Sequence, residues 1–321
     1  MTAGLAVVLL FLCRAVQVAG PGAGLPLDDA WIHLRFAGNL AAGNGFAFNP
    51  GESVAGSTSP LWVVFLALFS FLPGGRVGWT VGATAATYLL AVVLTGRLAA
   101  RLVGQERPSP SRHAAGVAAG LLAAVTGRFA WAGVSGMEVP LFACLTLGTM
   151  LLLLPGGSRM DREARSRQGI ALFLAGLSVL ARPEGWLLVA LVLVLILANR
   201  IGQRKGVVSA RRIARPPQAG NRNNLPLWWV PLPLLAPAVP WVFFCLLRNG
   251  SPLPSTFGPN GGGLAWPDTD FLFRTGKLFW SDNPFQLMLA VAGGLFLVSE
   301  IFSRGRCPAE LMPAAWVLLF P

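Results

Sequence analysis

Charged residues are scarce in this chain of 321 residues: they make up 12% of it, against 54% for hydrophobic residues. A soluble globular domain carries about 25% charged residues, so the scarcity argues against an ordinary soluble domain. Apolar stretches of membrane-spanning length recur along the whole chain. This pattern predicts an all-α, multi-pass transmembrane protein, with residues 1–321 forming one transmembrane domain.

Several familiar motifs are also missing. The sequence has no Walker A loop, no GxGxxG motif after a strand and no HExxH motif. Its four cysteines form no CxxC pair, so neither a disulfide framework nor a zinc site is predicted. Lysine is limited to Lys205 and Lys277 and histidine to His33 and His113, while glycine is abundant. That composition is typical of a GC-rich bacterial genome.

The formal charge of +12 could suggest a nucleic-acid partner. The arginines, however, fall in short clusters between apolar segments, as they do in the cytoplasmic loops of membrane proteins. We therefore expect no nucleic-acid partner. We expect about nine spanning helices, at residues 3–20, 78–99, 114–132, 138–154, 169–181, 185–198, 227–247, 285–303 and from 309 to the end.

The segment 58–73 is short for a full span, and the positive charge decides how it is interpreted. Four arginine-rich loops lie on one side of the membrane only if this segment does not cross. We therefore interpret 58–73 as a juxtamembrane or re-entrant helix on the outer face. The basic loops contain Arg97 to Arg112, Arg159 to Arg167, Arg200 to Arg222, and Arg304 with Arg306.

This topology places four polar segments on the outer side: residues 21–57, 133–140, 182–185 and 248–284. They hold the acidic residues Asp28, Asp29, Glu52, Glu138, Glu184, Asp268, Asp270 and Asp282. Acidic residues thus gather outside and basic residues inside. We expect an active site at the outer boundary of a bacterial cytoplasmic membrane, with the bilayer around the helices.

Asp28 and Asp29 are the strongest candidates for chemistry. An N-cap of the amphipathic helix expected at Ala30–Leu40 would explain one of them but not both. Paired carboxylates at a membrane edge are costly without a role. One of them, by a narrow margin Asp28, would act as a general base, while its neighbour would raise its pKa, orient an acceptor or hold a divalent cation. No cofactor is otherwise required.

The other outer segments offer weaker candidates, each with a structural alternative. Glu138 would complement the dipole at the start of an apolar helix or face substrate. Arg182 would form a local ion pair with Glu184 or bind a phosphate. His33 lies within two helical turns of the carboxylate pair and is a further candidate. The runs 43–45 and 49–52 are predicted turns, and 56–60 looks like the capped start of a helix.

Four segments in order along the chain resemble the GT-C superfamily of membrane glycosyltransferases, in particular the group with the mycobacterial terminal β-arabinofuranosyltransferase. The first motif is long and specific: DDAWIHLRFAGNLAAGNGFAFNPGE from Asp28 to Glu52, followed by GSTSPLW at 56–62. Shorter motifs follow, in order: GMEVPLF at 136–142, RPEG at 182–185 and GSPLPSTF at 250–257.

The resemblance implies a GT-C fold with its site facing the periplasm. The donor would be a polyprenyl-phosphate sugar, and the acceptor a hydroxyl on a glycan, lipid or protein, reached by an inverting transfer. Asp28 and Asp29 match the acidic pair that supplies the catalytic base, and Arg182 would meet the lipid phosphate. The further candidate substrate contacts are His33, Arg35, Glu52, Glu138, Glu184, Ser255, Thr256 and Lys277.

The chain departs from the family in two ways. Family members commonly continue the fourth motif with an aromatic residue, a small residue and Lys, whereas Gly258-Pro259-Asn260 follow here. Lys277 or Arg274 would replace that missing cation. Family members also extend further, and the apolar run at the end of this chain suggests a truncated C-terminal part.

A secondary transporter or lipid flippase is the main alternative, although the sequence shows no clear internal repeat and its charged motifs sit at helix ends. The second alternative is a non-catalytic relic of such a protein.

Overall fold

The computed structural model describes residues 2–19, 24–103, 109–154, 161–204 and 226–257, together with Lys277. The described chain is helical and contains no strand, only an isolated antiparallel bridge between Ala47 and Ser53. This confirms the all-α class. The helices are α1 (Thr2–Ala19), α2 (Asp28–Ala41), α3 (Pro60–Phe69), α4 (Arg76–Leu102), α5 (Ser109–Val125), α6 (Gly127–Ala132), α7 (Val139–Leu153), α8 (Asp161–Ala181), α9 (Gly185–Arg204), α10 (Pro231–Leu235) and α11 (Ala238–Asn249), with single 3-10 turns at Leu227–Trp229 and Ser255–Phe257.

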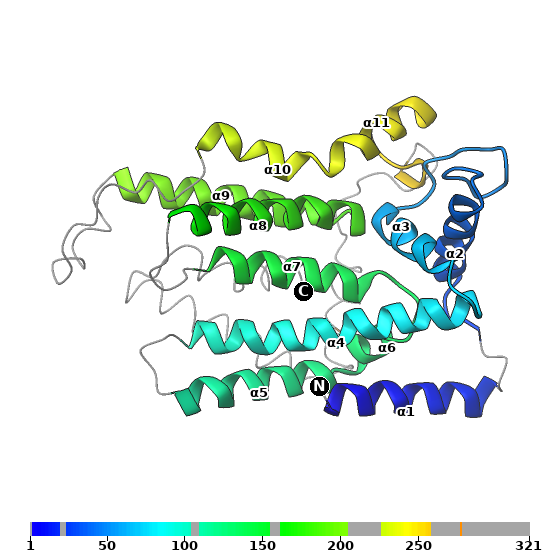
Figure 1. Cartoon of the computed structure of the whole chain (residues 1–321), viewed down its shortest axis with the longest axis horizontal. Coiled ribbons are helices and arrows are strands. Elements are labelled where there is room, and N and C mark those ends of the chain that lie inside the picture. Colours follow the sequence, from blue (N-terminus) through cyan, green and yellow to red (C-terminus); the bar gives the residue numbers. More distant parts are fainter. Residues whose placement is uncertain are drawn as a thin grey trace.

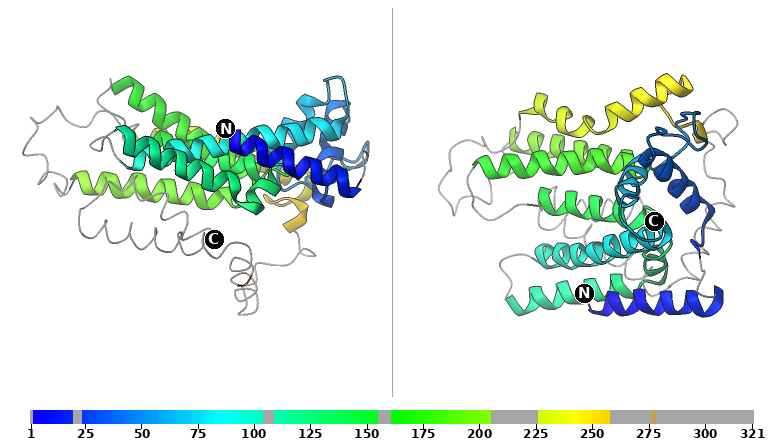
Figure 2. Two further views of the ribbon diagram at one scale, coloured as in Figure 1. Left: turned by 90° about the horizontal axis from the view of Figure 1, so that it is seen from below. Right: turned by 45° about the vertical axis from the view of Figure 1, so that its right-hand side comes forward.

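The long helices lie side by side, and α2 and α3 lie across one end of them (Figure 1). In the two further views α2 and α3 stay at that same end (Figure 2). Helix α3 packs against α2, α4 and α8. Its ten residues extend about 15 Å, half the thickness of a hydrocarbon core. The interpretation of 58–73 as a helix too short to span the membrane agrees with this length.

The expected set of about nine spanning helices is not confirmed. Within the described residues one helix, α4, is long and apolar enough to cross a membrane by length and composition. The segment expected at 114–132 is divided into α5 and α6 at Thr126. The segment expected at 227–247 is divided into a 3-10 turn, α10 and α11, because prolines recur through it and interrupt helical hydrogen bonding. The two segments expected after residue 284 lie outside the described residues.

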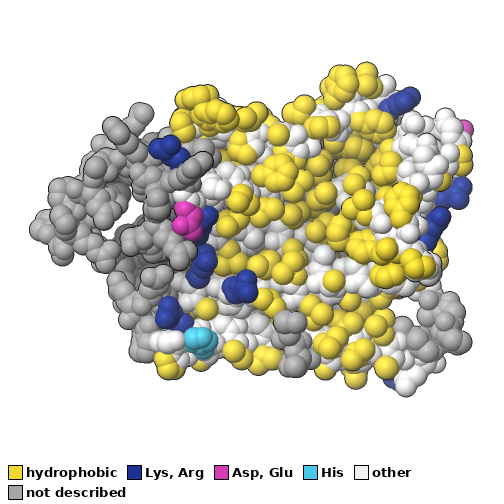
Figure 3. Space-filling view, in the orientation of Figure 1, with side chains coloured by type: hydrophobic (Ala, Val, Ile, Leu, Met, Phe, Trp, Pro, Cys, Tyr) yellow, Lys and Arg dark blue, Asp and Glu magenta, His cyan; other side chains and the backbone are white. Residues whose placement is uncertain are grey.

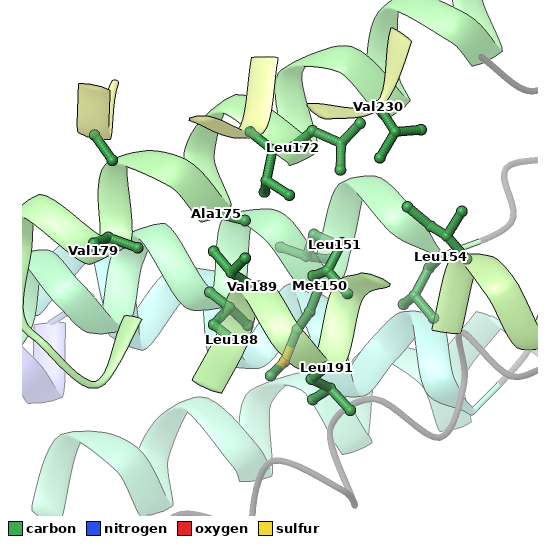
Figure 4. Packing of buried hydrophobic residues seen from close by; sticks show 14 of the residues in the cluster. Met150, Leu151, Leu154, Leu172, Ala175, Val179, Leu188, Val189, Leu191 and Val230 are labelled. Carbon is green, nitrogen blue, oxygen red and sulfur yellow. The ribbon is translucent and has the colours of Figure 1, made fainter. Parts of the chain in front are cut away.

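Buried aliphatic side chains hold the second half of the bundle together (Figure 4). Helices α7, α8, α9 and α10 all contribute to this core, in which Leu172, Leu188 and Val192 are fully buried. Helices α4 and α5 instead pack against each other at glycine residues. A Cβ on Gly96 would lie 2.7 Å from the carbonyl oxygen of Gly116. The two backbones are therefore in direct contact, and small residues are what allows this.

A hydrophobic belt separates the two ends of the bundle. Hydrophobic side chains cover the middle of the face in Figure 3, and basic side chains lie at its right-hand end and near the left-hand ends of α4, α5 and α8. There Arg101 donates from Nη1 to the carbonyl oxygen of Leu151 at 2.8 Å, and Arg167 donates from Nη2 to that of Leu154 at 3.2 Å. Both arginines satisfy carbonyl groups at the C-terminal end of α7. The acidic loops meet at the opposite end.

Candidate functional site

A cluster of polar side chains lies where α2 and α3 cross the end of the bundle. Its five members come from three separate parts of the chain: Ser57, His33, Glu138, Arg182 and Glu184. We call them the polar cluster. His33 and Ser57 belong to the first outer segment, Glu138 to the second and the other two to the third. In the described residues these three segments come together at one end of the bundle, and their location on the outer side of a membrane stays a prediction.

Arg182 is the centre of the polar cluster. It follows the last residue of α8, and its Nη1 donates to Oε1 of Glu138 at 2.7 Å. Its other edge holds Glu184, with Nη2 2.8 Å from Oε1 and Nε 3.2 Å from Oε2. Paired parallel hydrogen bonds of this kind are the strongest geometry between a guanidinium and a carboxylate. The local ion pair expected between Arg182 and Glu184 is therefore present, and a second carboxylate joins it.

Glu138 is the most deeply buried charged residue of the polar cluster, with 3% of its surface exposed. It precedes α7 directly. Its Oε2 lies 3.5 Å from Nε2 of His33, which is an ion-pair distance rather than a hydrogen bond. Among the described residues that oxygen has no hydrogen-bond partner. The contact with His33 thus ties α2 to the start of α7 without satisfying the carboxylate.

His33 is itself buried, and its second ring nitrogen faces a hydroxyl. Nδ1 lies 3.3 Å from Oγ of Ser57, and that oxygen accepts the backbone N–H of Ser59 at 3.2 Å. Because Ser57 Oγ already accepts one hydrogen bond, its own proton is free to be donated to Nδ1. The tautomer with its proton on Nε2 then points N–H towards Glu138. One face of α2 is fixed by this chain of contacts.

The electrostatics favour a charged Glu138. Burial raises the pKa of Glu138, but His33 and Arg182 beside it outweigh burial, so this pKa lies below its ordinary value. Burial lowers the pKa of Arg182, and the two carboxylates reverse that effect, so the Arg182 pKa is raised. The polar cluster therefore carries two carboxylate charges and one guanidinium charge, for a net charge of −1 when His33 is neutral.

A second contact fixes the segment before Glu138. The fully buried indole of Trp62 in α3 donates from Nε1 to the carbonyl oxygen of Gly136 at 3.0 Å. Gly136 has a φ of +82°, a conformation that residues with a side chain rarely adopt. A Cβ there would also lie 2.8 Å from the side chain of Leu25. Glycine is thus required for this loop to pass close to the start of α2.

The fourth outer segment also reaches the first. The backbone N–H of Ser255 donates to the carbonyl oxygen of Ala55 at 2.9 Å, and the Ser255 hydroxyl donates to the same oxygen at 3.3 Å. Ser255 and its neighbour Thr256 are exposed. The short motif at 250–257 is therefore attached to the first loop. Its predicted contact with substrate stays a prediction.

Asp28 and Asp29 occupy the first turn of α2 and are exposed. The suggested N-cap role is wrong, because the N-cap residue is Leu27 and no side chain caps the helix. Neither carboxylate has a hydrogen-bond or ion-pair partner within the described part of the chain. Asp29 precedes His33 by four residues, so the two lie about 6 Å apart along the same side of α2. The pair thus adjoins the polar cluster but is not part of it.

The remaining predicted residues lie outside the polar cluster. Arg35 is exposed and donates from Nε to the carbonyl oxygen of Phe48 at 3.0 Å. Glu52 accepts from the Asn49 side chain at 3.3 Å within the predicted turn, where Gly51 has a φ of +88°. Lys277 is exposed, and its chain neighbours lie outside the described residues. None of these observations tests a role with substrate.

Two members of the site were not predicted. Ser57 falls in the segment interpreted as a capped helix start, but α3 begins at Pro60 with no side-chain cap, and the Ser57 hydroxyl faces His33 instead. Trp62 looks like one more apolar residue of a short helix. Ser57 stands in the run Ser57-Thr58-Ser59 before Pro60, which resembles a helix start, so nothing local in the sequence marked Ser57 as a residue of the polar cluster.

Within the described residues no group of three or more histidine, cysteine, aspartate or glutamate side chains is arranged to hold a metal ion. Asp28 and Asp29 supply two adjacent carboxylates, which would leave most of the coordination to water or substrate oxygens. A divalent cation at this pair stays a prediction.

Comparison with known proteins gives one informative match. Over 191 residues the chain is 32% identical to the terminal beta-(1->2)-arabinofuranosyltransferase of Mycobacterium tuberculosis. This chain is similar to a glycosyltransferase. The match covers 56% of this chain and 30% of the relative, so the two proteins share only part of the relative's length. No family model matches the chain, and no solved structure matches it. The match supports the resemblance inferred from the four motifs.

Proposed function

We propose that the chain is the membrane part of a glycosyltransferase of the GT-C type. It would transfer a sugar from a polyprenyl-phosphate donor to a hydroxyl acceptor on a glycan, lipid or protein, at the outer face of the bacterial cytoplasmic membrane. One observation carries the proposal: the described parts of all four outer segments meet at one end of the bundle, beside the helix that bears Asp28 and Asp29. The similarity to a glycosyltransferase supports it.

The chemistry follows from the exposure of the carboxylates. Asp28 or Asp29 accepts the proton of the acceptor hydroxyl, and the oxygen attacks the anomeric carbon of the donor. The bond from that carbon to the phosphate oxygen breaks, and the phosphate leaves with the electron pair. A single displacement of this kind inverts the anomeric configuration. Arg182 stabilises the charge that develops on the phosphate, with Arg35 or Lys277 as further cations.

The basic end of the bundle supports an orientation in which the acidic end faces the periplasm. Helix α4 would cross the bilayer. The shorter helices beside it would be embedded in the same apolar layer, whose hydrophobic side chains form the yellow belt of Figure 3. The polar cluster would then lie at the membrane boundary, where a lipid-linked donor presents its phosphate.

The test is sugar transfer by Asp28→Asn and Asp29→Asn variants in membranes supplied with a labelled polyprenyl-phosphate sugar. At least one of them should lose transfer by 100-fold or more, on the order of what general-base catalysis contributes, while membrane insertion stays normal. Glu163→Gln, which changes an exposed residue of α8 at the opposite end, is the matched control. Normal transfer by both Asp variants would refute the proposal. Movement of the labelled lipid across the bilayer without transfer would indicate a flippase instead.

A further inference from the structure

The two carboxylates that hold Arg182 differ in how firmly they are themselves held. Glu138 is buried and contacted from two sides, by Arg182 and by His33. Glu184 has 32% of its side chain exposed, and Arg182 is its only partner among the described residues. One carboxylate is therefore fixed by its surroundings, whereas the other can turn into solvent by rotating its own side chain.

Arg182 is held by two carboxylates, and the backbone that carries it is fixed in the turn from α8 to α9. Its N–H donates to the carbonyl oxygen of Ser178 at 2.9 Å, and its own carbonyl accepts the N–H of Gly185 at 2.9 Å. A Cβ on Gly185 would lie 2.4 Å from backbone atoms of Ser178 and Val179. The turn from α8 to α9 is thus tightly packed. Of the three charged side chains, that of Glu184 has the fewest constraints.

Charge also requires that one carboxylate give way when an anion binds. The guanidinium has five N–H donors, and its Nε–Nη2 edge, the geometry that suits a phosphate bidentately, is occupied by Glu184. A phosphate entering without displacement would place three anions around one guanidinium. Losing Glu138 would leave a buried carboxylate without its cation, which is far more costly than hydrating an exposed one.

We propose that Glu184 is an exchangeable counter-ion, which occupies the phosphate-binding edge of Arg182 and leaves it when a phosphate arrives, while Glu138 remains as the fixed anchor. The ligand is a phosphate group, either the monoester or diester head of a polyprenyl lipid or a free phosphate. This rests on the proposed function insofar as the phosphate is that of the sugar donor. Glu184 would then weaken donor binding in the resting protein and release the site for product to leave.

The experiment measures equilibrium binding of labelled farnesyl phosphate to the purified full chain in detergent, which needs neither a sugar nor an acceptor. Glu184→Gln should bind about fivefold more tightly than the unchanged protein, which corresponds to about 1 kcal/mol. Glu138→Gln, which is matched in chemistry, should gain clearly less, because its amide oxygen still accepts from Nη1 of Arg182 and Glu184 still occupies the phosphate-binding edge. The gain in Glu184→Gln should disappear when Arg182→Met is added.

Farnesol and inorganic phosphate are the two comparison ligands in the same binding assay. Farnesol binding should be equal in the unchanged protein and in Glu184→Gln, since an alcohol does not compete for the guanidinium. A fivefold gain for inorganic phosphate as well would identify the phosphate group alone as the ligand, whereas a gain restricted to farnesyl phosphate would identify the lipid head. Equal or weaker farnesyl phosphate binding by Glu184→Gln would overturn the proposal, as would no binding by either protein. If binding behaves as expected and transfer is absent, only the glycosyltransferase function fails.

Discussion

Replacing Arg182 with Met is expected to destabilise the folded protein by about 3 kcal/mol at neutral pH. Among the described residues, Arg182 carries the one guanidinium that contacts Glu138, whose side chain is 4% exposed, and the change removes it. Removing one partner of a buried ion pair costs about 3 to 5 kcal/mol, because a charge is left buried without compensation. We take the lower limit because Arg182 is itself 28% exposed, and water reaches its side of the pair.

The loss should depend on pH in a direction that the structure fixes. In the unchanged protein the Glu138 pKa is lowered, so its stabilising contribution is present above the carboxyl pKa of the unfolded chain and is lost as pH falls through the lower, folded value. Without Arg182, one of the two side chains that lower the Glu138 pKa is lost, so this pKa should rise from its value in the unchanged protein. The folded variant should then bind a proton on Glu138 more readily than the folded unchanged protein does. Its deficit relative to the unchanged protein should therefore shrink as pH falls.

Thermal unfolding in detergent, at one scan rate and at about pH 7.5 and about pH 5, measures the stability deficit of Arg182→Met and its dependence on pH. A 3 kcal/mol loss corresponds to a decrease in Tm of roughly 4 to 5 °C for a chain of 321 residues. Arg97→Met, at an exposed position of α4, is the matched control and should change stability by less than about 0.5 kcal/mol. Adding Glu138→Gln should restore most of the loss. A deficit equal to that of Arg97→Met, or one that is the same at both pH values, would refute the reasoning.

Two further substitutions test the packing that positions the site. Trp62→Phe removes the buried indole donor to the loop carbonyl before α7 and should cost about 1 to 3 kcal/mol in thermal unfolding; Trp79→Phe, which loses an exposed indole hydrogen bond, should cost clearly less, and equal losses would contradict the assignment. Gly96→Ala should cost about 1 to 3 kcal/mol, because its Cβ would meet the Gly116 carbonyl at 2.7 Å. Gly82→Ala on the same helix meets nothing within 4 Å and should be neutral or stabilising by up to about 1 kcal/mol, so similar effects at both glycines would be evidence against close packing of α4 and α5.

The sequence predicted local features well where one physical rule dominated. The helix expected at Ala30–Leu40 forms as α2 over Asp28–Ala41, because its apolar residues recur with helical spacing. The turn at 49–52 forms around Gly51, whose positive φ suits glycine. The gathering of the outer segments followed from the distribution of arginine, which needs no knowledge of packing.

Boundaries and partners were predicted less well, because they depend on contacts between distant segments. The segment 114–132 reads as one apolar run, yet the chain turns at Thr126 into α5 and the short α6, which packs beside α1. Glu138 was expected to complement a helix dipole or face substrate. It does precede α7 directly, and it also bonds Arg182, which is 44 residues away in sequence. No local pattern encodes such a pairing.

Glu138 illustrates why a buried charge is hard to assign from sequence and yet informative once placed. Its position before α7 depends on Gly136, whose positive φ lets the loop pass beside α2, and on the indole of Trp62, which holds that loop from α3. These contacts bring the carboxylate against Arg182 and His33 at the same time. Apolar packing alone would hold the helices together at lower cost, since burying ions rarely gains stability. A buried charge that links the helix carrying Asp28 to the guanidinium is therefore better explained by the need to fix their relative position than by the stability of the fold.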